Sequence, residues 1–369
     1  MAGQVHVTPV GVGIVGFTAG RSWAARAHVP ALAALPGFEV VGVANSSAES
    51  SRAAAASLGL SRVHPTIEDL VADPLVDLVA ITVKVPHHRE LVATALQAGT
   101  DVYCEWPLGN GLAEAELLAA QAQAAGVRTA IGLQARSSPT IRYVRDLVRG
   151  GYLGEVLSTT LVGSSGSMGA AEREHLVYLN DAASGANVLT IPFGHAIDAL
   201  CWVLGEFREV SATTATRRPT YVVIETQEVR PRSIADQILV SGVLASGVVV
   251  SAHYRGGAPR GTGLRWEIHG TEGDLEITGP SGNLQATELT LRGGRGDEAT
   301  MSVMPVPAEY RSVPDDVTGP AINVAEAYAR FAEGPSAPDP VPDFDDAVIR
   351  HRLLDAIERS AASGTRILL

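Results

Sequence analysis

The chain has 369 residues, of which 46% are hydrophobic and 18% are charged. This composition supplies enough apolar material for about two packed domains and excludes a chain that is mainly disordered. The formal net charge of −12 argues against direct binding to nucleic acid or to an anionic membrane, because both carry negative charge. Lys84 is the only lysine among the 28 basic residues.

Cysteine usage and the N-terminal residues indicate the compartment. Cys104 and Cys201 are too few for a disulfide framework and are typical of reduced thiols. The segment MAGQVHVTPVGVGIVG at the N-terminus has no basic start followed by a long apolar run, so we expect no signal peptide. Apolar stretches are shorter than the ~20 residues that cross a bilayer. We therefore expect a cytoplasmic protein without a membrane anchor.

The first third of the chain alternates β-branched runs with alanine-rich helical stretches. We predict strands at 10–15, 38–44, 75–83, 101–105 and 127–133, and helices at 24–35, 48–58, 89–98 and 112–125. Such alternation predicts a parallel sheet covered on both faces, a doubly wound α/β domain, which we place at residues 1–134.

The rest of the chain, 135–369, predicts an α+β domain. A helix begins at Ser138-Pro139, with serine as its cap, and stops at Gly150-Gly151. A loop at 293–320, a stiff connector at 335–342 and a last amphipathic helix capped by Asp343 close the chain. Closely spaced strands, which favour a large antiparallel sheet with helices on one face, are predicted at 209–215, 221–228, 234–241, 247–254, 264–270, 274–278 and 287–292.

The loop after the first strand is a candidate phosphate-binding loop. The pattern G-x-G-x-x-G at 11–16 lies inside the strand, whereas residues 16–23 lie between strand and helix, where a phosphate loop belongs. Gly16 permits a tight turn whose backbone N–H groups can face a pyrophosphate. The alternative is a plain strand–helix turn. The side chains that we assign to cofactor binding here are those of Thr18, Arg21, Ser22 and Trp23.

The end of the second strand normally selects between NAD and NADP. An acidic residue there would bind the ribose hydroxyls and repel a 2′-phosphate, but the chain reads Asn45-Ser46-Ser47 with Arg52 shortly after. We assign Asn45, Ser46 and Arg52 to the cofactor and favour NADP over NAD. The alternative role of this segment is a helix cap.

Three further segments carry polar groups near the expected ligand-binding edge of the sheet. Gln134 and Arg136, after the strand predicted at 127–133, are candidates to contact a polyol. No group of cysteines and histidines has the spacing of a metal site. The remaining candidates are Val83, Lys84, Pro86 and His88 in the first segment, Glu105, Trp106 and Pro107 in the second, and Asn187, His195 and Asp198 in the third, with Tyr178 preceding it.

Six segments together resemble the glucose–fructose oxidoreductase/inositol dehydrogenase family, and within it the branch of fungal galactose-regulon repressors. They are FTAGRSWAARAH (17–28), VKVPHH (83–88), EWPL (105–108), LQARSSP (133–139), SGANVL with FGHAID (184–198) and IHGTEGDLEI (268–277). The resemblance implies a Rossmann domain, an open-faced sheet domain and a cofactor cleft between them. It also implies a homodimer or homotetramer formed through the open sheet.

Two departures from the family pattern concern catalysis. The family's E-x-P turn usually holds a lysine that assists proton transfer, but Trp106 stands there and cannot exchange that proton. An aspartate usually precedes the family's histidine by four residues, and here that position is Ile191. His195 matches the histidine and remains the conventional acid/base group. Lys84 is a second candidate, because a desolvated lysine can act as an acid or base.

These observations leave open three functions. The first is an NAD(P)-dependent oxidoreductase that acts on a sugar- or polyol-like alcohol through His195 and Lys84. The second is a dinucleotide-binding regulator without redox turnover, which Trp106 and Ile191 favour. The third is an NAD-assisted lyase or glycosidase. We favour the oxidoreductase, because the cofactor site is complete in the sequence and a histidine remains.

Overall fold

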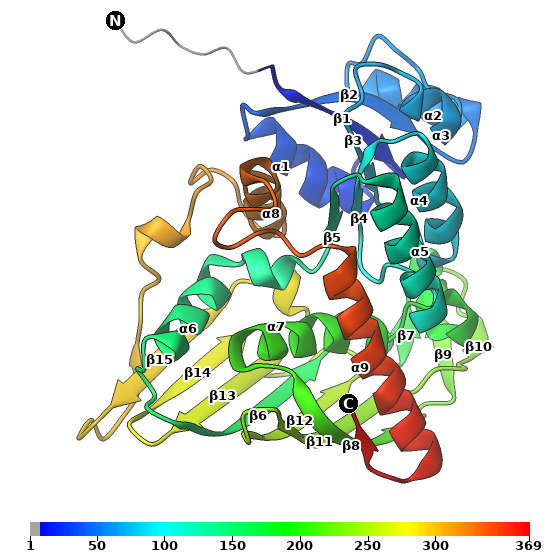
Figure 1. Ribbon diagram of the computed structural model, residues 1–369. Helices are drawn as coiled ribbons and strands as arrows, with labels where there is room; N and C mark the ends of the chain where they lie inside the picture. Colours follow the sequence, from blue (N-terminus) through cyan, green and yellow to red (C-terminus); the bar gives the residue numbers. More distant parts are fainter. Residues whose placement is uncertain (1–7) are drawn as a thin grey trace, which may run out of the picture. The chain divides into compact units, whose positions relative to one another are not determined.

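The computed structural model describes residues 8–369, and these form two compact units (Figure 1). Unit 1 comprises the residues up to Gly109, residues 113–132 and residues 312–347; unit 2 comprises residues 110–112, 133–311 and 348–369. The prediction that the chain has no signal peptide concerns a segment whose residues 1–7 lie outside the described residues. Within residues 8–369, we find no helix with the length and apolar character of a membrane span.

Unit 1 is built on a parallel sheet with the strand order β2-β1-β3-β4-β5, which confirms the predicted Rossmann-type fold. Gly11 and Gly13 lie inside the first strand, where a Cβ would strike Leu75 O at 1.8 Å or approach Leu70 at 3.0 Å. These glycines therefore serve close packing. The strands are β1 (Val10–Val15), β2 (Phe38–Ala44), β3 (Leu78–Ile81), β4 (Asp101–Cys104) and β5 (Thr129–Ile131).

Helices cover both faces of this sheet. Figure 1 shows α1 and α8 on one face and α4 and α5 on the other. A π-helical turn at Ala24–His28 leads into α1. The helices of unit 1 are α1 (Val29–Ala33), α2 (Ala48–Ser57), α3 (Ile67–Val71), α4 (His88–Gln97), α5 (Leu112–Ala125) and α8 (Ala321–Glu333).

Helix α8 belongs to unit 1, although the sequence analysis places residues 135–369 in the second domain and predicts no helix at 321–333. The physical reason is its apolar stripe. Val324, Tyr328 and Phe331 are buried in the same core cluster as the residues of α1 and the turn before it. Arg330 fixes the proline-rich connector that follows, because its Nε donates to Asp339 O at 2.8 Å.

Unit 2 contains a sheet with the strand order β16-β15-β14-β13-β6-β12-β11-β8-β17. The sequence predicts an antiparallel sheet, but β6 runs parallel to β12, so the sheet is mixed. The strands are β6 (Val156–Ser164), β8 (Phe207–Ala215), β11 (Gln237–Leu244), β12 (Val249–Arg255), β13 (Leu264–Gly270), β14 (Gly273–Gly279), β15 (Thr290–Arg295), β16 (Ser302–Val303) and β17 (Ile367–Leu368). A smaller sheet has the order β10-β9-β7 and consists of β7 (Ala171–Glu172), β9 (Thr220–Val223) and β10 (Val229–Pro231).

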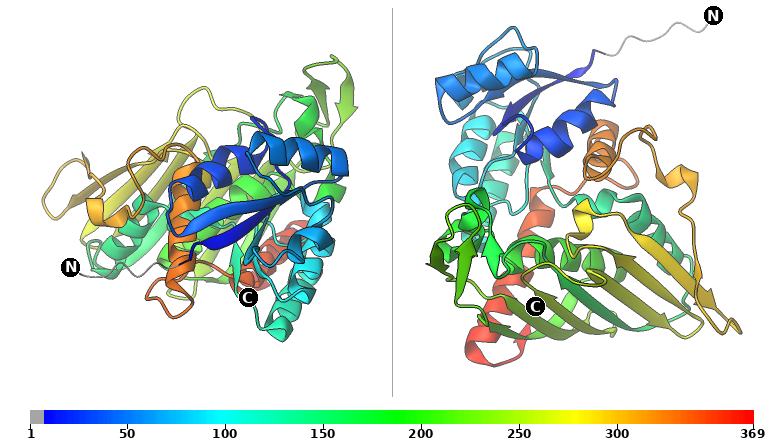
Figure 2. Two further views of the ribbon diagram at one scale, coloured as in Figure 1. Left: turned by 90° about the horizontal axis from the view of Figure 1, so that it is seen from above. Right: turned by 180° about the vertical axis from the view of Figure 1, so that it is seen from behind.

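The helices of unit 2 lie on one face of the large sheet, and Figure 2 shows the opposite face from behind. Outward side chains of β12, such as Val249 and Ser251, are exposed on that open face. Asp343 caps the last helix through the backbone N–H groups of residues 345 and 346. Ser138 stands at the predicted cap position without a capping bond from its side chain. The helices are α6 (Pro139–Arg149), α7 (Gly194–Leu204) and α9 (Phe344–Ser363), of which residues 348–363 belong to unit 2.

Candidate functional site

The turn after β1 has the geometry that a dinucleotide-binding loop requires. Gly16 has a φ of +100°, and its N–H donates to Ala44 O at 3.1 Å, which ties the ends of β1 and β2 together. A Cβ at this position would lie 2.6 Å from Val83 Cγ1 and 3.2 Å from the carbonyl carbon of Thr82. Position 16 therefore needs glycine both for its backbone conformation and for the close approach of the loop after β3.

Some side chains of this loop are exposed, and others form hydrogen bonds within the loop. Thr18 and Arg21 are exposed, so they are available to a ligand. The Ser22 hydroxyl donates to Thr18 O at 3.1 Å and accepts from the N–H groups of Thr18 and Ala25 at 3.0 and 3.2 Å. Ser22 thus holds the turn closed. Trp23 is half-buried, and its indole Nε1 is fully buried.

The polar residues after β2 divide in the same way. Asn45 Nδ2 donates to Phe17 O at 2.8 Å and so braces the glycine turn. Ser47 caps α2, because its hydroxyl accepts from Ser50 N at 3.1 Å. Ser46, Ser47, Glu49 and Arg52 are exposed. Because Ser47 is committed to the cap, Ser46 and Arg52 are the exposed hydroxyl and cation at this strand end that could meet a ribose hydroxyl or a phosphate.

The loop after β3 places its predicted residues in different environments. Lys84 and Pro86 are exposed, and so burial does not desolvate the Lys84 ammonium. His88 is 1% exposed, and its Nδ1 and Nε2 lie 2.8 Å from Pro107 O and 3.0 Å from Val83 O. Burial lowers the pKa of His88, although both carbonyl contacts oppose this shift. His88 therefore joins the loop after β3 to the loop after β4.

The loop after β4 begins with Glu105 and Trp106. Trp106 is 4% exposed and precedes Pro107 through a cis peptide bond. Glu105 Oε1 lies 2.7 Å from His28 Nε2, and the side chain of Glu105 is 13% exposed. Burial raises the pKa of the Cys104 thiol well above its usual range, in keeping with a packing role.

His28 was not assigned to the site from the sequence, and neither was its second partner. Its Nδ1 lies 2.8 Å from the Tyr328 hydroxyl of α8. The available signal was the place of His28 on the apolar stripe of the first helix, because a histidine buried on such a stripe needs hydrogen-bond partners. Its partners are 77 and 300 positions away in sequence, which no local pattern reveals.

The predicted residues of unit 2 centre on α7. His195 is 4% exposed at the second position of this helix. Asp198, one turn later, is fully buried and accepts from Arg136 Nε and Nη2 at 2.9 and 2.8 Å and from Arg350 Nε at 3.0 Å. Arg350 also donates to Glu206 at 2.7 Å. Burial alone would raise the pKa of Asp198, but the two guanidinium groups outweigh burial and hold that pKa below its ordinary value.

This network changes the interpretation of two predicted substrate contacts. Arg136 and Asp198 are brought together as partners of each other, and Asp198 also binds Arg350, so both hold the fold of unit 2 around α7. Asn187 Oδ1 accepts from Leu189 N at 2.9 Å and starts the helical segment that leads into α7. Gln134 is 1% exposed. Burial raises the pKa of Tyr178, which is half-buried.

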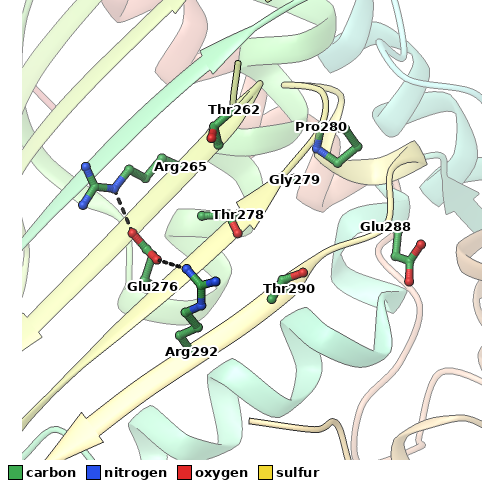
Figure 3. Close-up of a pocket in the computed structure, with 9 residues that line it drawn as sticks. All are labelled: Thr262, Arg265, Glu276, Thr278, Gly279, Pro280, Glu288, Thr290 and Arg292. Atoms are coloured by element: carbon green, nitrogen blue, oxygen red, sulfur yellow. Dashed lines mark hydrogen bonds and ion pairs between the residues drawn. The ribbon is translucent and has the colours of Figure 1, made fainter. Parts of the chain in front are cut away.

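A hollow over strands β13, β14 and β15 is lined by none of the predicted site residues. Figure 3 shows Glu276 between Arg265 and Arg292, whose guanidinium nitrogens lie 2.9 and 3.4 Å from its carboxylate oxygens. Threonines at 262, 278 and 290 line the same hollow, and so does Glu288. Glu276 pairs with both arginines, so the hollow is a polar surface of the large sheet.

Comparisons with known proteins match both parts of the chain. Residues 10–133 match the family described as "Oxidoreductase family, NAD-binding Rossmann fold", and residues 139–279 match "Gal80p, C-terminal domain". Dehydrogenase aclE of Aspergillus oryzae is 33% identical over 367 residues, which cover 96% of each chain. The galactose/lactose metabolism regulatory protein GAL80 of Kluyveromyces lactis is 28% identical over 432 residues, covering 95% of this chain and 93% of that protein. The crystal structure of a super-repressor mutant of Gal80p from Saccharomyces cerevisiae has a TM-score of 0.88 and 26% identity, covering 98% of both chains.

Proposed function

The chain belongs to the glucose–fructose oxidoreductase/inositol dehydrogenase family, and from this premise we propose that it is an NAD(P)-dependent oxidoreductase acting on a sugar- or polyol-like alcohol. The observation that carries the proposal is the glycine turn after β1, where the positive φ of Gly16 and its tight packing against the loop after β3 leave room only for glycine; a turn of this kind between strand and helix is where a dinucleotide fold would bind a pyrophosphate. The 33% identity to a dehydrogenase over nearly the whole chain supports the redox part.

The residues of unit 1 fit a nicotinamide dinucleotide. Backbone N–H groups of the turn that Gly16 opens would face the pyrophosphate, and the exposed Thr18 and Arg21 would add donors. When bound, the dinucleotide supplies the hydride acceptor. Glu105, at the carboxyl end of β4, would accept a hydrogen bond from a ribose hydroxyl.

We propose NADP as the preferred form. Ser46 and Arg52 are exposed after β2, and no carboxylate stands at Asn45 to repel a 2′-phosphate. A guanidinium group is suited to bind phosphate through paired N–H donors. Titration with NADPH and NADH would show tighter binding of NADPH, and equal affinities would contradict this preference.

We assign the proton transfer to His195. Its neutral imidazole would accept the hydroxyl proton of the alcohol as the hydride leaves the same carbon. Asp198 accepts three hydrogen bonds from Arg136 and Arg350, so it fixes the helix that carries His195 and does not act as a base. Lys84 is the alternative proton carrier, and its exposure favours a role at the ligand over one in the core.

The test is a screen of sugars and polyols with both dinucleotides, read out by the absorbance of reduced nicotinamide. Turnover that falls about 100-fold or more in His195→Gln, with unchanged dinucleotide affinity, would support the assignment. Lys84→Ala is the parallel variant, and a comparable loss there would transfer the role to Lys84. Dinucleotide binding without turnover of any substrate would contradict the oxidoreductase.

A dinucleotide-binding regulator is the second candidate, and Trp106 favours it. The indole can stack on a ring but cannot move a proton. The match of residues 139–279 to the Gal80p C-terminal domain points in the same direction. A dinucleotide that copurifies and never changes its redox state in bulk would support the regulator.

We also propose that copies of the chain associate through the open face of the large sheet. Leu239 and Val249 on neighbouring strands of that face are 46% and 57% exposed. Light scattering would show a dimer or tetramer, and Leu239→Glu would shift it toward the monomer. A wild-type monomer at micromolar concentration would contradict this assembly.

A further inference from the structure

A continuous series of hydrogen bonds inside unit 1 joins Glu105, His28 and Tyr328. Glu105 Oε1 lies 2.7 Å from His28 Nε2, and His28 Nδ1 lies 2.8 Å from the Tyr328 hydroxyl. His28 and Tyr328 are both fully buried, whereas the Glu105 side chain is 13% exposed. The series of hydrogen bonds thus runs from the buried phenol of Tyr328 to the Glu105 carboxylate, which reaches the surface of the unit.

The direction of each hydrogen bond follows from the chemistry of the partners. An ionised carboxylate only accepts, so His28 Nε2 carries the proton that it donates to Glu105. The other nitrogen of a neutral imidazole is then an acceptor, and the Tyr328 O–H donates to it. Burial raises the pKa of Tyr328 well above its usual range, so this hydroxyl keeps its proton at neutral pH.

The aromatic surroundings hold the His28 ring in this orientation. Tyr103 meets His28 edge-on with ring centroids 5.2 Å apart, and Tyr328 does so at 5.7 Å. A ring packed on two sides in this way cannot turn to present Nδ1 to Glu105 without disturbing the core. Geometry therefore fixes which nitrogen faces the carboxylate, and the carboxylate fixes the tautomer.

The carboxylate receives this donor at the start of the loop after β4. The donated N–H of His28 holds the Glu105 side chain in one orientation at a position that is mostly removed from water. An ionised carboxylate held in one orientation at the carboxyl end of β4 is an acceptor for the hydroxyl groups of a ligand, and a ribose diol has that chemistry.

We propose that His28 is a positioning residue for dinucleotide binding, which holds Glu105 as an oriented acceptor for ribose hydroxyls, and that Tyr328 fixes the His28 ring for this task. This inference rests on the proposed binding of a dinucleotide by unit 1 but not on redox turnover. It also gives α8 a function, because Tyr328, which completes the series of hydrogen bonds, lies on this helix.

The experiment is a double-mutant cycle on dinucleotide affinity, measured by calorimetric titration of the full chain with NADPH and NADH. Glu105→Gln is expected to weaken binding about tenfold, because a charged hydrogen bond to the ligand is lost. His28→Leu is expected to weaken it by a similar factor. The double variant is expected to bind no more weakly than Glu105→Gln alone, because His28 acts through Glu105.

Two further variants separate positioning from general damage to the fold. His28→Gln keeps an N–H donor toward Glu105 and is expected to restore most of the affinity that His28→Leu loses. Tyr328→Phe keeps the ring, removes the hydroxyl and is expected to weaken binding about threefold. If His28→Leu does not fold, the cycle is run with Tyr328→Phe and Glu105→Gln, whose effects must likewise fail to add.

Tyr254→Phe is the matched control. The Tyr254 hydroxyl is equally buried, donates to Gly282 O at 3.2 Å and belongs to unit 2. The Tyr254→Phe variant is expected to have a lower free energy of unfolding and an unchanged dinucleotide affinity. Additive effects of His28 and Glu105 variants, or full affinity in folded His28→Leu, would overturn the inference and leave the proposed function standing. A wild-type chain that binds neither dinucleotide would overturn both.

Discussion

Replacing Gly16 with alanine should damage unit 1 far more than the same replacement at Gly20, four residues later in the same loop. Both residues have positive φ, +100° and +68°, so both substitutions place an L side chain in an unfavourable backbone region. They differ in the space around the new methyl group. At position 20 nothing lies within 4 Å, whereas at position 16 the methyl carbon would meet Val83 Cγ1 at 2.6 Å.

The expected magnitudes follow from these two differences. Alanine at position 20 should cost about 1 kcal/mol, since φ is close to the left-handed region. At position 16 the backbone strain is about 1–3 kcal/mol. Val83 must also leave its rotamer or move, which costs about 1 kcal/mol more because β-branched side chains are stiff. Gly16→Ala should therefore lose about 2–4 kcal/mol.

Urea unfolding followed by tryptophan fluorescence measures the loss of stability, and titration with NADPH measures the effect on the loop. We expect Gly16→Ala to weaken NADPH binding by tenfold or more, because displacing Val83 moves two loops of the proposed site together. Equal losses of stability at the two positions would refute the reasoning, since the contact with Val83 is what distinguishes them.

The remaining predictions concern four side chains. Asp198→Asn should destabilise unit 2 by about 3–5 kcal/mol in urea unfolding, because it removes the buried carboxylate that Arg136 and Arg350 share. The pKa of Asp198 is lower in the folded protein than in the unfolded chain. Its contribution to stability is therefore complete above the pKa of the unfolded chain and is lost as the pH falls through the pKa of the folded protein. Asp198→Asn should remove this part of the acid unfolding. Arg52→Ala should weaken NADPH binding about tenfold and leave NADH binding unchanged in the same titration. His195→Gln should abolish turnover in a substrate screen while the affinity for dinucleotide stays the same. Trp106→Lys should raise turnover if the site lacks only its proton carrier.

Much of the fold could be predicted because its signals are local. The strands Val10–Val15 and Phe38–Ala44 and the helix Leu112–Ala125 have the predicted bounds, since apolar runs there end at glycine, proline or a polar turn. The strand β6 escaped prediction because its sequence, VLSTTLVGS, is rich in hydroxyl side chains and alternates weakly. Its place beside β12 is set by packing between segments about 90 residues apart.

The candidate site shows the same difference between local and long-range signals. The turn at Gly16 could be predicted, because its position between strand and helix is a local feature. The internal use of Ser22 and Asn45 could not, since it depends on hydrogen bonds that appear only when the loops have met. The same holds for Asp198, which has the sequence spacing of a substrate contact and in the fold binds a guanidinium from α9.

The two units bear differently on whether the chain is an enzyme or a regulator. Under either proposed function, the features of unit 1, namely the glycine turn, the exposed Arg52 and the hydrogen-bonded series that ends at Glu105, would serve dinucleotide binding. Only unit 2 carries the conventional acid/base group of the family pattern, and Asp198 beside it is committed to two arginines. With Trp106 in place of the family's lysine, redox catalysis therefore depends on the protonation of His195 or Lys84. An active wild type would show a pH profile that shifts when the responsible residue is replaced, whereas a regulator would show affinity for dinucleotide with no profile to shift.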